Sequence, residues 1–308
     1  MRLGNEHNQM VDTNEMIHAA LNHPCWFHSI ELSPGIVTPG RKTAQNLEEE
    51  WRALRLPDLR GKAVLDIGAY DGYFSFAAER AGAARVTALD HYVWSVDMAE
   101  YMKEWNATHL SGRFLPAPHK SRHWKPEELP GRGPFDSARL ALGSHVTPIV
   151  GDFMTMDLVP LGQFDVVLFL GVLYHMENPL EAMRRLAAVT APHGLAVIET
   201  LAVDIPGLEN RACCEFFPGS ELNNDESNWW APNAKAIEGL CMASGFKTVT
   251  ILRDKPKRTL KSRAVGAIKH LLHETPLMRA LGLEGRGYLP VTRYRAFAHA
   301  RAGEKSEG

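Results

Sequence analysis

Cysteine is scarce in this chain of 308 residues, and its positions form no familiar pattern. The four cysteines are Cys25, Cys213, Cys214 and Cys241. They include no CxxC pair and no metal-ligand spacing, which argues against a disulfide-stapled secreted domain and against a zinc site. The histidines are scattered, and "HKSRH" at 119–123 is a poor set of metal ligands. The sequence therefore predicts no bound metal.

Long apolar runs and an excess of one charge are also missing. No stretch approaches the roughly 18–20 apolar residues that cross a bilayer. The N-terminal run MRLGNEHNQMVDTNEM is polar and lacks the apolar core of a secretory signal. The formal net charge is −2, so no global basic field indicates a nucleic-acid partner. We expect a cytoplasmic protein that does not enter a membrane, and its oligomeric state stays open.

What the sequence does contain is an alternation of apolar strands with helical stretches. The expected strands are 63–68, 85–90, 146–153, 164–173, 195–201, 247–253 and 292–301. The expected helices are 14–22, 43–57, 73–82, 178–192 and 234–246. This order predicts an α/β fold, in which a mostly parallel sheet is covered by helices on both faces.

Two long stretches interrupt the alternation and suggest how the chain is divided. We expect an N-terminal helical and loop lid at 1–60 and a cofactor-binding core at 61–254 with an insertion at 95–135. Residues 255–308 would add a basic insertion, 255–290, and a final strand, 292–301, that completes the core. Insertions of this length in a compact domain are usually functional lids or disordered segments.

The first strand leads into a turn, Gly68-Ala69-Tyr70-Asp71-Gly72. A dinucleotide-binding turn has the pattern G-x-G-x-x-G, because its backbone must approach a pyrophosphate closely. Here Tyr70 takes the place of the second glycine, and the carboxylates of Asp66 and Asp71 would repel a pyrophosphate. The same carboxylates suit a ligand that carries an ammonium group.

Acids also stand at the ends of the next two strands. Asp90 ends the second strand, where a carboxylate can accept both hydroxyls of a ribose. Asp152 ends the third strand, where a side chain can meet an adenine amino group. A ligand with adenine, ribose and a charged amino acid but no phosphate is S-adenosylmethionine. A nicotinamide enzyme and a ligand-free α/β module remain the alternatives.

At these residues the chain resembles the class I, Rossmann-like methyltransferases, over 61–254 and 292–301. The runs "GVLYHMENPLEAM", "VIETL" and "NWWAPNAKAIEGLCMASGF" are similar to those of the tRNA wobble-uridine (5-carboxymethoxyuridine) methyltransferase family and its small-molecule methyltransferase relatives. The resemblance implies a Rossmann-like seven-stranded, mostly parallel sheet with one antiparallel strand near the C-terminus. It implies that Asp66, Gly68 and Gly72 line the methionine end of the cofactor and that Asp90 holds the ribose. It also implies that Asp152 and Phe153 hold the adenine, and that Leu170 and Gly171 line the site at the end of the fourth strand.

The resemblance also bears on which form of the cofactor is used. In the wobble-uridine enzymes a tyrosine, here Tyr174, an arginine, here Arg295, and a lysine read the extra carboxylate of a carboxylated cofactor. The lysine is missing, because the residues after Trp26 read Phe-His-Ser-Ile-Glu-Leu. This departure favours ordinary methyl transfer.

An oxygen acceptor of high pKa would need a proton acceptor in the protein. The candidates are His175 after the fourth strand, Glu199 at the end of the fifth and His28 in the N-terminal loop, which is also a candidate substrate contact. Alternatives are a capping role for His175, a pairing of Glu199 with a buried arginine and an ordinary loop position for His28. The adjacent Trp229 and Trp230 would project oppositely on an extended chain, so one could reach the substrate; the alternative is that both are packing anchors.

Three functions remain open at this stage. A small metabolite or natural product, methylated on oxygen, fits the near-neutral charge and the expected lids. Modification of tRNA would use the basic run 255–273, which can follow phosphates. An apolar stripe at 264–283 would suit an interfacial helix, although packing over the sheet or a dimer contact explains it as well.

Overall fold

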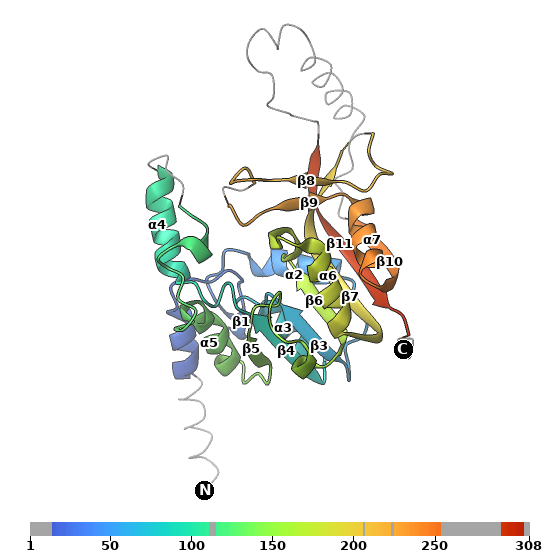
Figure 1. The fold of residues 1–308 in the computed structure, drawn as a ribbon. Coiled ribbons are helices and arrows are strands. Elements are labelled where there is room, and N and C mark those ends of the chain that lie inside the picture. Colours follow the sequence, from blue (N-terminus) through green and yellow to red (C-terminus); the bar gives the residue numbers. More distant parts are fainter. Residues whose placement is uncertain (1–13, 111–114, 206, 223–224, 254–290, 305–308) are drawn as a thin grey trace, which may run out of the picture.

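The computed structural model describes residues 14–110, 115–205, 207–222, 225–253 and 291–304. Its centre is a seven-stranded sheet with the strand order β10-β11-β7-β6-β3-β4-β5 (Figure 1). The strands are β3 (Ala63–Ile67), β4 (Arg85–Asp90), β5 (Thr147–Val150), β6 (Phe164–Leu170), β7 (Thr190–Asp204), β10 (Phe246–Arg253) and β11 (Thr292–Ala302). All seven predicted strands are present.

Strand β11 runs antiparallel to both of its neighbours, β7 and β10, while the pairs β7–β6, β6–β3, β3–β4 and β4–β5 are parallel. The predicted α/β class, with one antiparallel strand near the C-terminus, is confirmed. Strand β7 is much longer than the predicted 195–201, because it continues to Asp204 in register with β11. Glu199 therefore lies within β7 and is not at its end; it pairs with Leu170, the last residue of β6.

The two faces of the sheet bury alternate residues of the same strands, as the two-residue period of a strand requires. Val64, Leu168 and Val197 belong to one core cluster, whereas Leu65, Phe169 and Ile198 belong to the other. The first cluster includes residues of α3 (Tyr73–Arg80) and α5 (Gly133–Ala141), and the second includes residues of α6 (Pro179–Val189) and α7 (Ala234–Ala243). The helices therefore lie on both faces of the sheet.

Side-chain caps explain where three of the helices begin. Helix α2 (Ala44–Ala53) is capped by Thr43, α6 by Asn178 and α7 by Asn233, and each cap accepts a backbone N–H three residues further on. The helices end several residues before their predicted limits: α2 at Ala53 instead of 57, and α7 at Ala243 instead of 246.

Some stretches to which the sequence assigned no strand or helix contain regular structure. Residues 26–40 include the antiparallel strands β1 (Glu31–Ser33) and β2 (Ile36–Val37). The insertion 95–135 includes helix α4 (Met98–Leu110) and the start of α5. A second short sheet, β8 (Cys214–Phe216) and β9 (Trp230–Pro232), crosses one end of β11 (Figure 1). Residues 255–290, with the basic run and the apolar stripe, lie outside the described residues.

The N-terminal segment packs into the same core as the sheet. Trp26, Ile30 and Leu32 are buried in one cluster with Val64 of β3 and Phe76 of α3. The indole of Trp26 also donates to the carbonyl of Ala20, at 3.1 Å. The part of 1–60 that the structure describes is therefore continuous with the core, and the division into domains stays a prediction.

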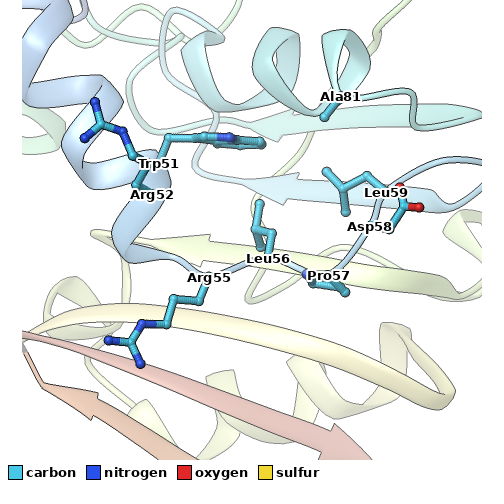
Figure 2. A pocket seen from close by; sticks show the side chains of 8 residues that line it. All are labelled: Trp51, Arg52, Arg55, Leu56, Pro57, Asp58, Leu59 and Ala81. Carbon is cyan, nitrogen blue, oxygen red and sulfur yellow. The ribbon is translucent and has the colours of Figure 1, made fainter.

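A hollow lies between α2 and the loop that leads into β3. Figure 2 shows Trp51, Leu56 and Leu59 facing it, while the guanidinium groups of Arg52 and Arg55 lie at its outer side. This hollow is at the amino-terminal end of β3, away from the edge where ligands of parallel sheets bind. Among the described residues no helix is both long and apolar enough to cross a membrane.

Candidate active site

Three carboxylates stand at the carboxyl ends of three neighbouring strands. Asp66 is the next-to-last residue of β3, Asp90 is the last residue of β4, and Asp152 follows β5 by two residues. Because these strands are parallel, their carboxyl ends meet at one edge of the sheet. The sheet order places β4 between β3 and β5, so the three acids form a row along that edge.

Most backbone N–H groups of the turn after β3 already donate hydrogen bonds to other groups of the protein. Gly68, Tyr70 and Gly72 all have positive φ, at 79°, 56° and 90°, which is the conformation that favours glycine. The N–H groups of Gly68 and Ala69 both donate to the carbonyl of Leu89, and that of Gly72 donates to the carbonyl of Ala69. The N–H of Tyr70 donates to Asp90 at 2.9 Å. A pyrophosphate would therefore find four of the five backbone donors of this turn already engaged.

The remaining turn residue, Asp71, does not face the ligand edge as the sequence suggested. Its carboxylate accepts the backbone N–H groups of Phe27 and His28, at 2.9 and 2.8 Å, and also contacts Nδ1 of His28. Asp71 is 1% exposed, and the ring of Phe27 stacks on that of Tyr70. The Asp71 carboxylate therefore fastens the N-terminal segment to the turn, a role that sequence spacing gave no means of finding.

His28 is accordingly part of that attachment. Its ring is buried and packs near Tyr70, Tyr73 and Phe74. The predicted contact between His28 and a substrate stays a prediction, because the observed partner of its Nδ1 is Asp71.

Burial controls the electrostatics of the acids on β3 and β4. Burial raises the pKa of Asp66 to about 6, although the hydroxyl of Ser75, which donates to this carboxylate at 2.6 Å, acts in the opposite direction. Burial also raises the pKa of Asp90, and the N–H groups of Tyr70 and Val93 counter that effect. Each Asp90 oxygen accepts one of these N–H groups and retains lone pairs for a further donor.

The carboxylate that follows β5, that of Asp152, is less buried than those of Asp66 and Asp90. The carboxylate of Asp152 accepts from the N–H of Met154 and the hydroxyl of Thr155, both at 2.9 Å. The ring of Phe153 is buried in the core against Phe169, and its predicted place beside the adenine stays a prediction.

A second cluster surrounds Gly171, directly after β6. A Cβ at Gly171 would lie 3.6 Å from Nη2 of Arg295, 3.6 Å from Oη of Tyr174 and 3.8 Å from Oε2 of Glu199. The guanidinium of Arg295 contacts both oxygens of Glu199 and lies over the ring of Tyr174. The alternative in which Glu199 pairs with an arginine is therefore the one that the structure shows.

His175 lies beside this cluster, with its ring 4.3 Å from that of Tyr174. Its Nδ1 is 2.9 Å from the carbonyl oxygen of Ser227 and 3.0 Å from the Ser227 hydroxyl. Burial lowers the pKa of His175, which keeps the ring neutral near pH 7. A neutral imidazole that donates from Nδ1 has its free lone pair on Nε2.

The two adjacent tryptophans act as anchors. The indole N–H of Trp230 donates to the carbonyl of Met176, and the backbone N–H of Trp229 donates to the carbonyl of Tyr174. Both indoles pack on Phe216 of β8. These contacts hold the tryptophans against the short sheet, and a role for either indole in binding substrate stays a prediction.

The insertion contributes residues that the sequence did not single out. Tyr92, two residues after Asp90, packs against His119 and Trp124 of the insertion, and its hydroxyl is 3.2 Å from Nδ1 of His119. The insertion thus folds back onto the carboxyl end of β4, next to the row of acids. The aromatic residues of the insertion and the position of Tyr92 after β4 could be seen in the sequence, but only the fold shows that they are in contact.

The sheet order and the row of acids along its carboxyl edge define a class: the Rossmann-like, S-adenosylmethionine-dependent methyltransferases. Within the described residues no group of three or more His, Cys, Asp or Glu is placed to hold a metal ion.

The comparison with protein families agrees with this class. A family described as a methyltransferase domain matches residues 41–251, more than half of the chain, and the chain belongs to that family.

Individual relatives have names that bear on substrate. The chain is 26% identical over 215 residues to a tRNA U34 carboxymethyltransferase of Idiomarina loihiensis, covering 67% of this chain and 54% of the relative. It is 28% identical to that of Chromohalobacter salexigens, covering 71% and 57%. The chain thus spans little more than half the length of these relatives.

Among solved structures, the N-terminal domain of EvdMO1 with SAH (S-adenosylhomocysteine) and D-fucose is similar in fold. It has a TM-score of 0.52 and 16% identity, and the match covers 94% of this chain and 97% of that one.

The buried acid on β3 gives a pH-dependent prediction. Because the pKa of Asp66 is raised from 3.8 to about 6 in the folded chain, its stabilising contribution is complete below about pH 4 and is lost as pH rises through 6. Asp66→Asn mimics the protonated acid and keeps an acceptor for Ser75. Relative to the parent chain, the variant should therefore be more stable at pH 7 than at pH 4 by about 2.5 kcal/mol.

Urea unfolding at both pH values measures this difference. Asp157→Asn, which removes an exposed carboxylate, serves as the control for loss of a charge. A stability difference between parent and Asp66→Asn that is the same at pH 4 and pH 7 would contradict the assigned burial effect.

Proposed function

We propose that this methyltransferase transfers a methyl group from S-adenosylmethionine to a hydroxyl oxygen of a small molecule, with His175 as the proton acceptor. The observation that carries the proposal is the combination of a row of strand-end acids with a turn whose N–H groups are already used. That edge suits a nucleoside with an ammonium group and offers little to a pyrophosphate.

Specific residues are proposed to hold the cofactor. Asp66, Gly68 and Gly72 would line its methionine end, and Asp90 would accept the ribose hydroxyls. Asp152 and the backbone of Phe153 would meet the adenine. Leu170 and Gly171 would close the site at the end of β6, next to Tyr174.

The chain's own residues supply position and a proton acceptor. When bound, the cofactor supplies a methyl group attached to a sulfonium. The sulfur keeps the electron pair of the S–C bond when the methyl group is transferred. Nε2 of His175 carries the free lone pair and would take the proton of the acceptor hydroxyl. The pKa of His175 is lowered by burial, so the ring is deprotonated and ready to accept at neutral pH.

We propose that Glu199 acts by holding Arg295 and not as a base. Both oxygens of Glu199 are contacted by the guanidinium, so both are already engaged with Arg295. In the same pair the charge of Glu199 offsets the positive charge of Arg295, so Arg295 has little net charge to offer an additional carboxylate on the cofactor. This supports ordinary methyl transfer over carboxymethyl transfer.

The tRNA alternative rests on the names of the relatives. The residues proposed for it from sequence, 255–273, lie outside the described residues. A direct experiment separates the two substrates. Methyl transfer from labelled S-adenosylmethionine should appear in a pool of small phenols and sugars and not in total tRNA. Label in tRNA, together with tRNA binding that weakens steeply as salt rises, would establish the alternative instead.

Cofactor binding has its own test. Asp90→Asn should weaken the affinity for S-adenosylhomocysteine, measured by calorimetry, by about tenfold to a hundredfold, because a charged hydrogen bond contributes about 1.5–3 kcal/mol. Asp165→Asn is a matched control: that carboxylate also accepts a backbone N–H, of Ala63, but at the opposite edge of the sheet. Equal losses in the two variants, or tight binding of NAD in place of S-adenosylhomocysteine, would refute the assignment.

The proton acceptor is tested by His175→Gln. Turnover should fall by about 100-fold, a typical contribution of general base catalysis, while the affinity for S-adenosylhomocysteine changes less than twofold. His145→Gln, which alters an exposed histidine, should turn over as the parent does. Unchanged turnover in His175→Gln would show that no base is needed at this position.

A further inference from the structure

The loop between β8 and β9 carries an acid and a hydroxyl that meet His175. The hydroxyl of Ser227 donates to Oδ1 of Asp225 at 2.7 Å, and the backbone N–H of Ser227 donates to the same oxygen at 2.9 Å. On its other side the Ser227 hydroxyl lies 3.0 Å from Nδ1 of His175. The three side chains form one continuous chain of hydrogen bonds.

This loop is held in place on both sides of His175. The N–H of Trp229 donates to the carbonyl of Tyr174 at 2.8 Å, and the indole of Trp230 donates to the carbonyl of Met176 at 3.0 Å. The side-chain amide of Asn228 donates to the carbonyl of Leu222 at 3.0 Å. Ser227 is 8% exposed, so its hydroxyl has few competing water molecules.

The direction of the protons in this chain follows from the donor and acceptor types. The carbonyl oxygen of Ser227 can only accept, so Nδ1 of His175 must carry the proton that joins them. The carboxylate of Asp225 also only accepts, so the Ser227 hydrogen points toward Asp225. The Ser227 oxygen then presents its lone pairs to the N–H of His175.

The geometry points to Asp225 and Ser227 as positioning residues for His175: they fix its tautomer with Nε2 free and stabilise the positive charge that arises when Nε2 takes a proton. This inference rests on the proposed function, in which His175 is the proton acceptor. It assigns a role in the reaction to the 225–230 loop.

The charges around His175 support the assignment. Burial is the largest influence on the pKa of His175 and lowers it, while the charge of Asp225 and the bond to Ser227 raise it and Arg295 lowers it. Tyr92 and Tyr174 also face this region, and burial raises the pKa of both phenols, so they stay neutral near pH 7. Asp225 is therefore the acid that offsets the burial of the ring.

The test is a titration of His175 by NMR in the full chain bound to S-adenosylhomocysteine, with the His175 signals assigned by their loss in His175→Gln. Asp225→Asn should lower the pKa of His175 by about one unit. The acid limb of the kcat/KM profile should move to lower pH by the same amount. Ser227→Ala should act in the same direction, and Ser227→Thr, which keeps the hydroxyl, should restore the parent value.

Glu226→Gln is the matched control, because it removes a neighbouring charge from the same loop and should leave the pKa of His175 unchanged. An affinity for S-adenosylhomocysteine within twofold of the parent confirms that each variant is folded. A His175 pKa that is the same in Asp225→Asn as in the parent, or that shifts equally in Glu226→Gln, overturns the inference.

The two proposals fail differently. A shifted pKa in Asp225→Asn combined with full turnover in His175→Gln keeps the link between Asp225 and His175 and removes His175 as the base. A loss of turnover in His175→Gln without any pKa shift in Asp225→Asn keeps the base and removes the link.

Discussion

The parallel pairing of β3 with β4 and β6 is the constraint on which the candidate site depends. Each of these strands is buried on both faces, so a shift of one residue in register would exchange the side chains of the two cores. The register is therefore strongly specified, and with it the positions of the strand ends. Asp66, Asp90 and Gly171 come to one edge because the cores on either side of the sheet hold the strands in line.

Several buried charged groups near this edge form hydrogen bonds or ion pairs within the protein, and these contacts determine which of them can still bind a ligand. Asp71 is committed to two backbone N–H groups and to His28, which joins the N-terminal segment to the turn. Glu199 is committed to Arg295. Isolated charges are costly to bury, so these pairings leave Asp66, Asp90 and Asp152 as the carboxylates with capacity for a ligand.

The elements that meet at the carboxyl ends of β4 and β6 come from distant parts of the chain. The end of β4 meets the insertion through Tyr92 and His119, and the end of β6 meets the 225–230 loop through His175 and Ser227. One sheet edge flanked by elements from separate parts of the chain agrees with the rule that function lies in the site and not in the fold.

The sequence by itself determined the α/β class, the seven strands and the row of acids at the ends of β3, β4 and β5. These features depend on local patterns: apolar runs of strand length, glycine at a turn, and an acid near the end of a strand. Helix α4 and the short paired strands β1–β2 and β8–β9 were missed, because their apolar patterns are short or weak.

Only the tertiary structure decided which charged groups are partners. The pairs Asp71–His28, Glu199–Arg295 and Asp225–His175 join residues 43 or more positions apart, and no periodicity in the sequence reports such a distance. The extension of β7 to Asp204 was likewise decided by its pairing with β11. The physical reason is the same in each case: a strand or a turn is specified by neighbours along the chain, whereas the partner of a buried charge is specified by the packing of the whole fold.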